Sequence, residues 1–130
     1  MGYRSQVVLA VSKELKPYFL TALASSQNAA SLVFKETDHF EEDGYNNGTM
    51  LMSWSSIKWY DSYKDVNIIE KFVSDCETES LEGWETEQDE EHGYAYQHLR
   101  FLRIGEEYDD VVDRGEHCYD DIHISREIQF

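Results

Sequence analysis

Basic residues and long apolar runs are scarce in this chain of 130 residues. Lys and Arg number 11 against 27 Asp and Glu, which gives a formal net charge of −16 at pH 7. This charge disfavours non-specific binding to DNA, RNA or an anionic membrane, because like charges repel. No apolar stretch reaches the length of about 18 residues that a membrane-spanning helix needs, so none is predicted.

Cysteine is also rare, with Cys76 and Cys118 as the two examples. The pair is too widely spaced for a disulfide framework, and no CxxC motif is present, so we expect two reduced thiols. No secretory signal peptide is recognisable. We therefore expect a cytoplasmic protein, in the host cytoplasm if it is encoded by a phage.

Motifs that mark enzymes and metal sites are missing as well. The chain contains no GxSxG, Walker loop, GxGxxG or HExxH pattern. His, Cys and Asp gather in residues 117–123, but without the ligand spacings of zinc sites. The sequence thus predicts a protein that is not an enzyme and has no cofactor or metal.

Enough apolar side chains are present to form a core. Hydrophobic residues make up 41% of the chain and aromatic residues 14%, which is too much for a disordered acidic tail. The length fits one compact domain over residues 1–130. That domain includes an acidic segment at residues 75–92.

The pattern of apolar residues predicts five strands and two helices. A helix with Ser12 as its N-cap and a second helix are expected where apolar residues recur at a spacing of three to four. The expected order is strand 5–11, helix 13–26, a strand beginning at 32–34, a strand around 50–55, helix 63–76, strand 94–104 and strand 122–128. Residues 105–115 are interpreted as a connection. This β-α-β-β-α-β-β order predicts an α+β fold, a single domain with a mostly antiparallel sheet of about five strands and two helices packed on one face.

The negative charge is concentrated in one part of the sequence. Residues 75–121 hold 17 acidic and three basic residues, a balance of −14, whereas residues 1–74 have a balance of −2. Within this stretch, two acidic blocks at 75–91 and 106–121 flank the expected strand 94–104. If that segment is a strand, both blocks lie at its ends and form one directed electrostatic surface.

The first acidic block has the spacing of a nucleic-acid backbone. Carboxylates at alternate positions of an extended chain lie on one side, about 6.6–6.8 Å apart. Glu85, Glu87, Asp89 and Glu91 follow this spacing. Such a row is comparable to successive phosphates and suits a groove lined by Lys and Arg, although a solvated acidic loop has the same composition.

The second acidic block and two aromatic residues complete the candidate partner-binding surface. Its expected electrostatic contacts are Glu106, Glu107, Asp109 and Asp110, and its expected aromatic anchors are Trp84 and Tyr108. Aromatic and acidic side chains together are typical of an interface that receives Arg.

Three segments of the chain carry a family resemblance. They are MGYRS at residues 1–5, WSSIKWY at residues 54–60, and FLRIGE at residues 101–106 followed by YDD at residues 108–110. Together they resemble a family of small proteins encoded by phages, prophages and bacteria. The resemblance implies one small domain linked to phages, and small phage proteins often act by binding host machinery.

These observations predict a phage-type acidic protein that binds and inhibits a basic host protein. The expected partner is a nucleic-acid-handling or defence factor, reached by nucleic-acid mimicry, with no direct binding to nucleic acid or membrane and a homodimer left open. One alternative is a small metal-dependent enzyme using Asp109, Asp110, His117 and His123. A second alternative is an acidic scaffold domain that forms homo-oligomers.

Overall fold

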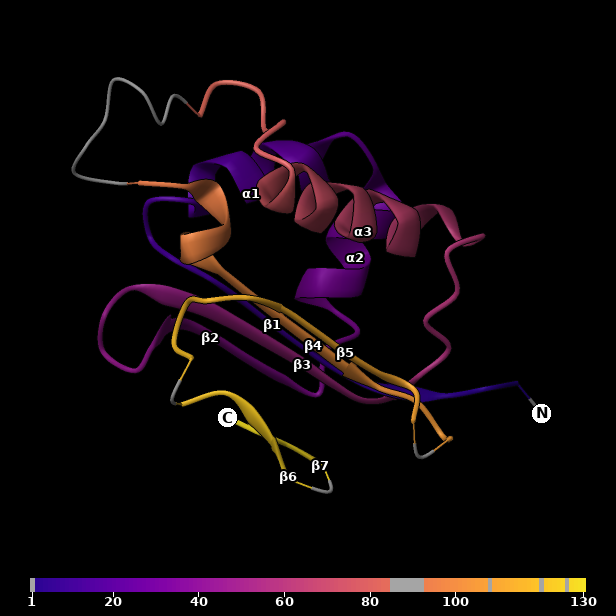
Figure 1. Cartoon of the computed structure of the whole chain (residues 1–130). Coiled ribbons are helices and arrows are strands. Elements are labelled where there is room, and N and C mark those ends of the chain that lie inside the picture. The colour runs from indigo at the N-terminus through magenta and orange to yellow at the C-terminus, as the bar shows by residue number, and fades with distance from the viewer. Residues whose placement is uncertain (1, 85–92, 108, 120, 126) are drawn as a thin grey trace.

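A five-stranded antiparallel sheet organises the molecule (Figure 1). The computed structural model describes residues 2–84, 93–107, 109–119, 121–125 and 127–130. The sheet has the strand order β2-β3-β1-β4-β5, and every neighbouring pair is antiparallel. The five strands are β1 (Ser5–Val11), β2 (His39–Gly44), β3 (Thr49–Ile57), β4 (Leu99–Ile104) and β5 (Val111–Gly115). The expected α+β fold with an antiparallel sheet is confirmed.

The central strand β1 is apolar along most of its length because both of its faces are covered. Val7, Val8, Leu9, Ala10 and Val11 are all fully buried. A strand covered on one face only alternates apolar and polar residues, whereas one covered on both faces is a continuous apolar run. The run at residues 7–11 therefore reflects the layers above and below the sheet.

Three helices cover one face of the sheet (Figure 1). They are α1 (Lys16–Ala24), α2 (Gln27–Phe34) and α3 (Lys64–Glu77), followed later by the short 3₁₀ turn η1 (Ala95–His98). The helix expected at 13–26 with Ser12 as its N-cap is shorter, because α1 begins at Lys16 with Leu15 as its N-cap and Pro17 in its first turn. Ser12 Oγ accepts a hydrogen bond from Leu15 N (3.1 Å) ahead of the helix. Helix α3 buries Val66, Ile69 and Phe72 and matches the expected helix 63–76 within one residue at each end.

Residues 32–34, expected to begin a strand, lie in helix α2. Ser26 caps this helix by accepting a hydrogen bond from Ala29 N (3.4 Å). Ala29, Leu32 and Val33 are buried and share one helical face. The apolar run Leu32-Val33-Phe34 belongs to this helix, so the chain has one more helix than expected and β2 begins at His39.

The other face of the sheet is covered by a separate hairpin. Strands β6 (His123–Ser125) and β7 (Glu127–Gln129) pair with each other and not with the main sheet. Ile122 and Ile128 pack against Val8, Ala10 and other residues of this face. The expected single strand 122–128 is thus a hairpin, and the fifth strand of the sheet is β5, within the segment 105–115 interpreted as a connection.

Further differences concern the expected strand 94–104 and the membrane. Residues 95–98 form η1, so β4 begins only at Leu99. Among the described residues, no helix combines the length and apolar character required to cross a bilayer.

Candidate functional site

The turn between β4 and β5 is held by contacts with the N-terminal segment. Tyr3 donates a hydrogen bond to Asp110 Oδ2 (2.6 Å). Arg103 donates two hydrogen bonds to the same carboxylate, from Nη1 to Oδ2 (3.2 Å) and from Nη2 to Oδ1 (3.0 Å). The hydrogen bond from Tyr3 and then those from Arg103 lower the pKa of Asp110. Asp110 is therefore held as a carboxylate in an internal cluster.

Backbone contacts brace the same turn. Glu107 N donates to Tyr3 Oη (3.0 Å), and Gly105 N donates to the carbonyl of Asp110 (2.8 Å). A Cβ atom at residue 105 would lie 2.1 Å from both Asp110 Oδ2 and Tyr3 Oη. Only glycine therefore leaves room for the Tyr3 and Asp110 side chains to meet here.

Described residues of the three segments 1–5, 54–60 and 101–110 meet at this place. Arg4 N donates to Glu106 Oε1 (3.1 Å), and Arg4 Nη1 donates to the carbonyl of Ser56 (3.2 Å). A Cβ atom at Gly2 would lie 2.7 Å from side-chain atoms of Lys58 and Tyr60, so these groups are also adjacent. These residues thus build one end of the sheet, which is a structural role for them.

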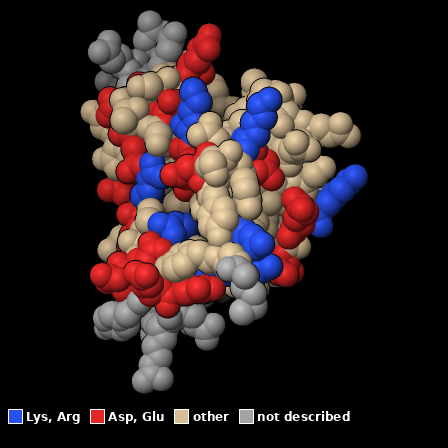
Figure 2. All heavy atoms as spheres, turned by 90° about the vertical axis from the view of Figure 1, so that its right-hand side faces the viewer, with Lys and Arg blue, Asp and Glu red and all other residues tan. Residues whose placement is uncertain are grey.

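Three carboxylates project from this braced turn into solvent. Glu106, Glu107 and Asp109 are exposed, whereas Asp110 is partly buried. Figure 2 views the molecule from the side toward which the N-terminus points in Figure 1, and acidic atoms gather at the lower left of this face. Negative charge is therefore exposed beside the hydrogen-bonded residues Gly105 and Asp110.

The arginines of the acidic stretch are all engaged in internal contacts. Arg100 is buried and contacts Asp113, the carbonyl of Gly115 (3.0 Å) and the carbonyl of Ile122 (3.2 and 3.3 Å). Arg103 binds Asp110, as described above. Arg100 and Arg103 are thus bound to partners within the molecule.

Arg114 is the third of these arginines and joins β5 to α3. Its Nη1 donates to Glu70 Oε2 (2.9 Å), its Nη2 to Ser74 Oγ (2.9 Å), and its Nε to Glu77. Sequence reasoning missed these roles. For Arg100 and Arg103 the available signal was their place in the apolar strand 99–104, because a charged group on a buried strand requires partners.

Trp84 packs within the molecule. Its indole N–H donates to the carbonyl of Gly93 (2.9 Å), and its ring contacts Tyr18 and His98 with centroid distances of 5.4 and 5.1 Å. The side chain is partly buried against the main core. Glu85, Glu87, Asp89, Glu91 and Tyr108 lie outside the described residues.

The residues of the metal-dependent alternative occupy different ends of β4. Asp110 is bonded to Gly105 N beyond the last residue of the strand, whereas His117 N is bonded to the carbonyl of Leu99, the first. Six steps along an extended strand, from Leu99 to Gly105, separate two groups by roughly 20 Å. Within the described part of the chain, no three His, Cys, Asp or Glu side chains are grouped so as to hold a metal ion.

His117 lies in a partly buried polar cluster. Its Nε2 is 2.8 Å from Thr49 Oγ1, and Cys118 Sγ is 3.9 Å from the same oxygen. Burial and then nearby His98 lower the pKa of His117, and Glu14 acts in the opposite direction. The cluster therefore favours a neutral imidazole.

The fold defines a class, an α+β domain with an open antiparallel sheet, a helical layer and a hairpin layer. Comparison with family models, with curated proteins and with solved structures found no match for this chain.

Proposed function

We propose that this protein binds and inhibits a partner protein through a basic surface of that partner. The observation that carries the proposal is the β4–β5 turn, where Glu106, Glu107 and Asp109 are exposed on a braced backbone. The net charge of −16 attracts a basic partner over a distance and orients its approach.

These contacts support binding because they hold Gly105, Glu107 and Asp110 in place before the partner arrives. Tyr3 and Arg103 hold Asp110, and the backbone bonds of Gly105 and Glu107 fix the turn around it. A turn that is already ordered loses less conformational entropy on binding than a free loop. We assign Asp110 to this positioning role and the three exposed carboxylates to the contact.

The proposed partner is a host protein whose Lys and Arg side chains normally bind nucleic acid. The family resemblance motivates the phage origin and the inhibitory role, with a defence factor as the second partner class. The alternating carboxylates at residues 85–91 motivate nucleic-acid mimicry, and Trp84 and Tyr108 remain predicted anchors.

Charge reversal at the turn tests the proposal. We expect the triple variant Glu106→Lys, Glu107→Lys and Asp109→Lys to lose capture of nucleic-acid-binding proteins from host lysate. Its matched control reverses Glu36, Glu42 and Asp61, which are also exposed, so both variants change the net charge from −16 to −10. Capture by the wild type is expected to fall between ~0.05 M and ~0.5 M salt, because salt screens exposed charges.

Competition with DNA identifies the surface of the partner. Added duplex DNA is expected to displace the captured protein, since both occupy the same basic surface. Equal capture by the two triple variants would contradict the assignment to the turn, and capture that DNA does not compete would contradict mimicry.

A further inference from the structure

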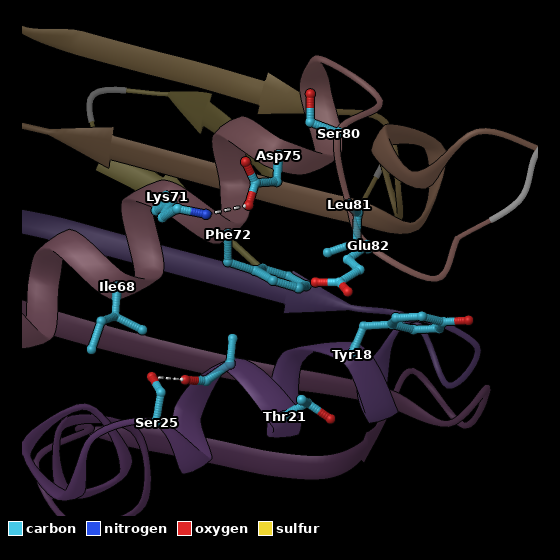
Figure 3. A pocket seen from close by; sticks show the side chains of 11 residues that line it. Tyr18, Thr21, Ser25, Ile68, Lys71, Phe72, Asp75, Ser80, Leu81 and Glu82 are labelled. Carbon is cyan, nitrogen blue, oxygen red and sulfur yellow. Dashed lines mark hydrogen bonds and ion pairs between the residues drawn. The ribbon is translucent and has the colours of Figure 1, made fainter.

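A groove of about 770 Å³ runs between helices α1 and α3 on the outer side of the helical layer (Figure 3). Its third wall is the segment at residues 80–82, which follows α3. The volume lies within the range of about 300–1,000 Å³ that is typical of ligand sites. The groove lies on helices, whereas the exposed carboxylates of the proposed function project from the sheet end.

The floor of the groove is apolar. Tyr18 and Ala22 contribute from α1, Ile68 and Phe72 from α3, and Leu81 from the third wall. Figure 3 shows Ile68 and Phe72 facing the same gap as Tyr18 and Thr21. Except for Phe72, which is buried, these apolar residues are only partly buried by the core, so an apolar partner gains free energy by covering them.

The polar lining of α1 has already donated its hydroxyl protons. Thr21 Oγ1 donates to the carbonyl of Pro17 (2.9 Å), Ser25 Oγ to that of Ala22 (2.6 Å), and Tyr18 Oη to that of Gly83 (3.2 Å). A hydroxyl that has donated its proton still has lone pairs with which to accept. The oxygens of this wall are therefore acceptors for an incoming donor.

The charged side chains that line the groove also favour a ligand that donates hydrogen bonds or carries positive charge. Lys71 is bonded to Asp75, with Nζ 3.0 Å from Oδ2, and Glu82 is exposed at the third wall. Two carboxylates and one ammonium group give the lining a net charge of −1. Acceptors and negative charge around an apolar floor suit a ligand that is apolar on one side and carries Lys or Arg at its edges.

We propose that this groove binds a cationic amphipathic helix of a partner protein. The walls α1 and α3 are helices whose central backbone groups are bonded within each helix. An extended peptide would find few backbone partners there, whereas a helix satisfies its own backbone and presents side chains at a spacing of three to four. A second copy of this chain does not suit the groove, because each copy carries a charge of −16.

This inference rests on the proposed function only in the sign of the partner's charge, and its test is separate. The probe is a synthetic helical peptide of Leu and Lys, as long as the 14 residues of α3, with Leu on one face. Control peptides replace every Lys by Glu, replace every Leu by Gln, or place Pro at the centre. Isothermal titration calorimetry at ~0.15 M salt measures the dissociation constant. Only the Leu–Lys peptide without Pro is expected to bind.

Two variants test whether the peptide binds in the groove. Thr21→Phe fills the groove from an exposed position of α1 and is expected to weaken binding about tenfold or more. Its control is Leu20→Phe, an exposed position of the same helix that does not line the groove. Glu82→Lys is expected to weaken binding about three- to tenfold, with Glu36→Lys as the control of equal charge. Circular dichroism verifies that each variant is folded.

Each remaining outcome overturns the inference. Binding that neither Thr21→Phe nor Glu82→Lys weakens would place the peptide elsewhere on the acidic surface. Equal binding of the Gln peptide would show simple electrostatic adhesion, and equal binding of the Pro peptide would show an extended ligand. Sedimentation of the protein alone detects a second copy as the occupant, because Thr21→Phe would then reduce dimerisation. The triple variant at residues 106, 107 and 109 is expected to retain peptide binding, so failure of the proposed function at the turn leaves this result intact.

Discussion

The two ends of strand β4 favour opposite charge states of the ionisable side chains beside them. At the Ile104 end, hydrogen bonds from Tyr3 and Arg103 lower the pKa of Asp110 and favour its charged form. At the Leu99 end, burial lowers the pKa of His117 and favours its neutral form. The difference follows from the dominant cause at each end, which is hydrogen bonding to the charged carboxylate at Asp110 and desolvation of the imidazole at His117. Charge is therefore retained at the end where the carboxylates project.

Arg100 is the exception at the Leu99 end. Its side chain is 2% exposed, yet a guanidinium does not lose its proton in proteins. It is stabilised instead by Asp113 and by the carbonyls of Gly115 and Ile122. A charge is thus accepted in the buried region only where acceptors surround it.

The largest expected effect comes from removing this buried charge. Arg100→Met leaves two backbone carbonyls without their partner and is expected to lower the free energy of unfolding by about 3 kcal/mol. Arg103→Met, at a side chain 20% exposed, is expected to lower it by about 1 kcal/mol, because water replaces part of the lost bonding. Urea denaturation at pH 7 measures both values, and equal losses would contradict the contrast between the two ends.

The second-largest expected loss of stability comes from filling the space between Gly105, Tyr3 and Asp110. Gly105→Ala is expected to lower the free energy of unfolding by about 2 kcal/mol, because the new methyl group overlaps Tyr3 Oη and Asp110 Oδ2. Tyr3→Phe removes one of these two overlaps. The double variant is therefore expected to lose less stability than the sum of the single variants, as measured in a double-mutant cycle.

Gly2→Ala is the matched control for this cycle. A Cβ atom there meets the flexible end of Lys58 and the hydroxyl at the tip of the partly exposed Tyr60 ring, which leaves more freedom to move than the bonded pair at Gly105. Its expected loss is below that of Gly105→Ala. Strict additivity of Tyr3→Phe and Gly105→Ala would show that the two groups do not share the space as described.

The smallest effect is a difference in pH dependence between the two ends. Because the pKa of His117 is lowered, the unfolded chain takes up a proton there first, and stability falls as the pH drops below the ordinary value of 6.5. The pKa of Asp110 is also lowered, so its contribution is present above the ordinary value of 3.8 and is lost as the pH falls through the lower folded value. Urea denaturation at a series of pH values measures both windows.

Single substitutions separate the two windows. His117→Gln is expected to reduce the loss of unfolding free energy below pH 6.5, and Asp110→Asn the loss below pH 3.8. His39→Gln, at a side chain 44% exposed, serves as a control for the loss of an imidazole. An upper window that persists in His117→Gln would assign it to another group.

Local patterns were sufficient to predict the central strand and the third helix. The apolar run at residues 7–11 and the spacing of Val66, Ile69 and Phe72 each reflect contacts that the element itself organises. At residues 32–34 the same reasoning failed because three consecutive apolar residues are compatible with either a strand or a buried helix face. The cap at Ser26, three residues before Ala29, was the signal that favours the helix.

Contacts between residues that are far apart in the sequence could not be predicted from local patterns. The alternating isoleucines at 122, 124 and 128 are consistent with a strand, but pairing of this segment with itself depends on the apolar patch at Val8 and Ala10. Asp110 resembles its acidic neighbours in sequence, yet its partner Tyr3 lies 107 positions away. Charge therefore predicted the candidate residues, whereas the contacts that hold Asp110 could be found only in the structure.

The central position of β1 has a consequence for biosynthesis. This strand is made first, but its partner β4 follows 88 to 98 residues later, from the pairs Val11–Leu99 and Gln6–Ile104. At ribosomal rates of about 5–20 residues per second, the apolar run at residues 7–11 waits about 5–20 s for that partner. During this interval β1 can pair with β3 along one edge only, and its open apolar edge favours aggregation. We therefore expect the yield in cells to depend on translation speed and on chaperones that hold apolar segments.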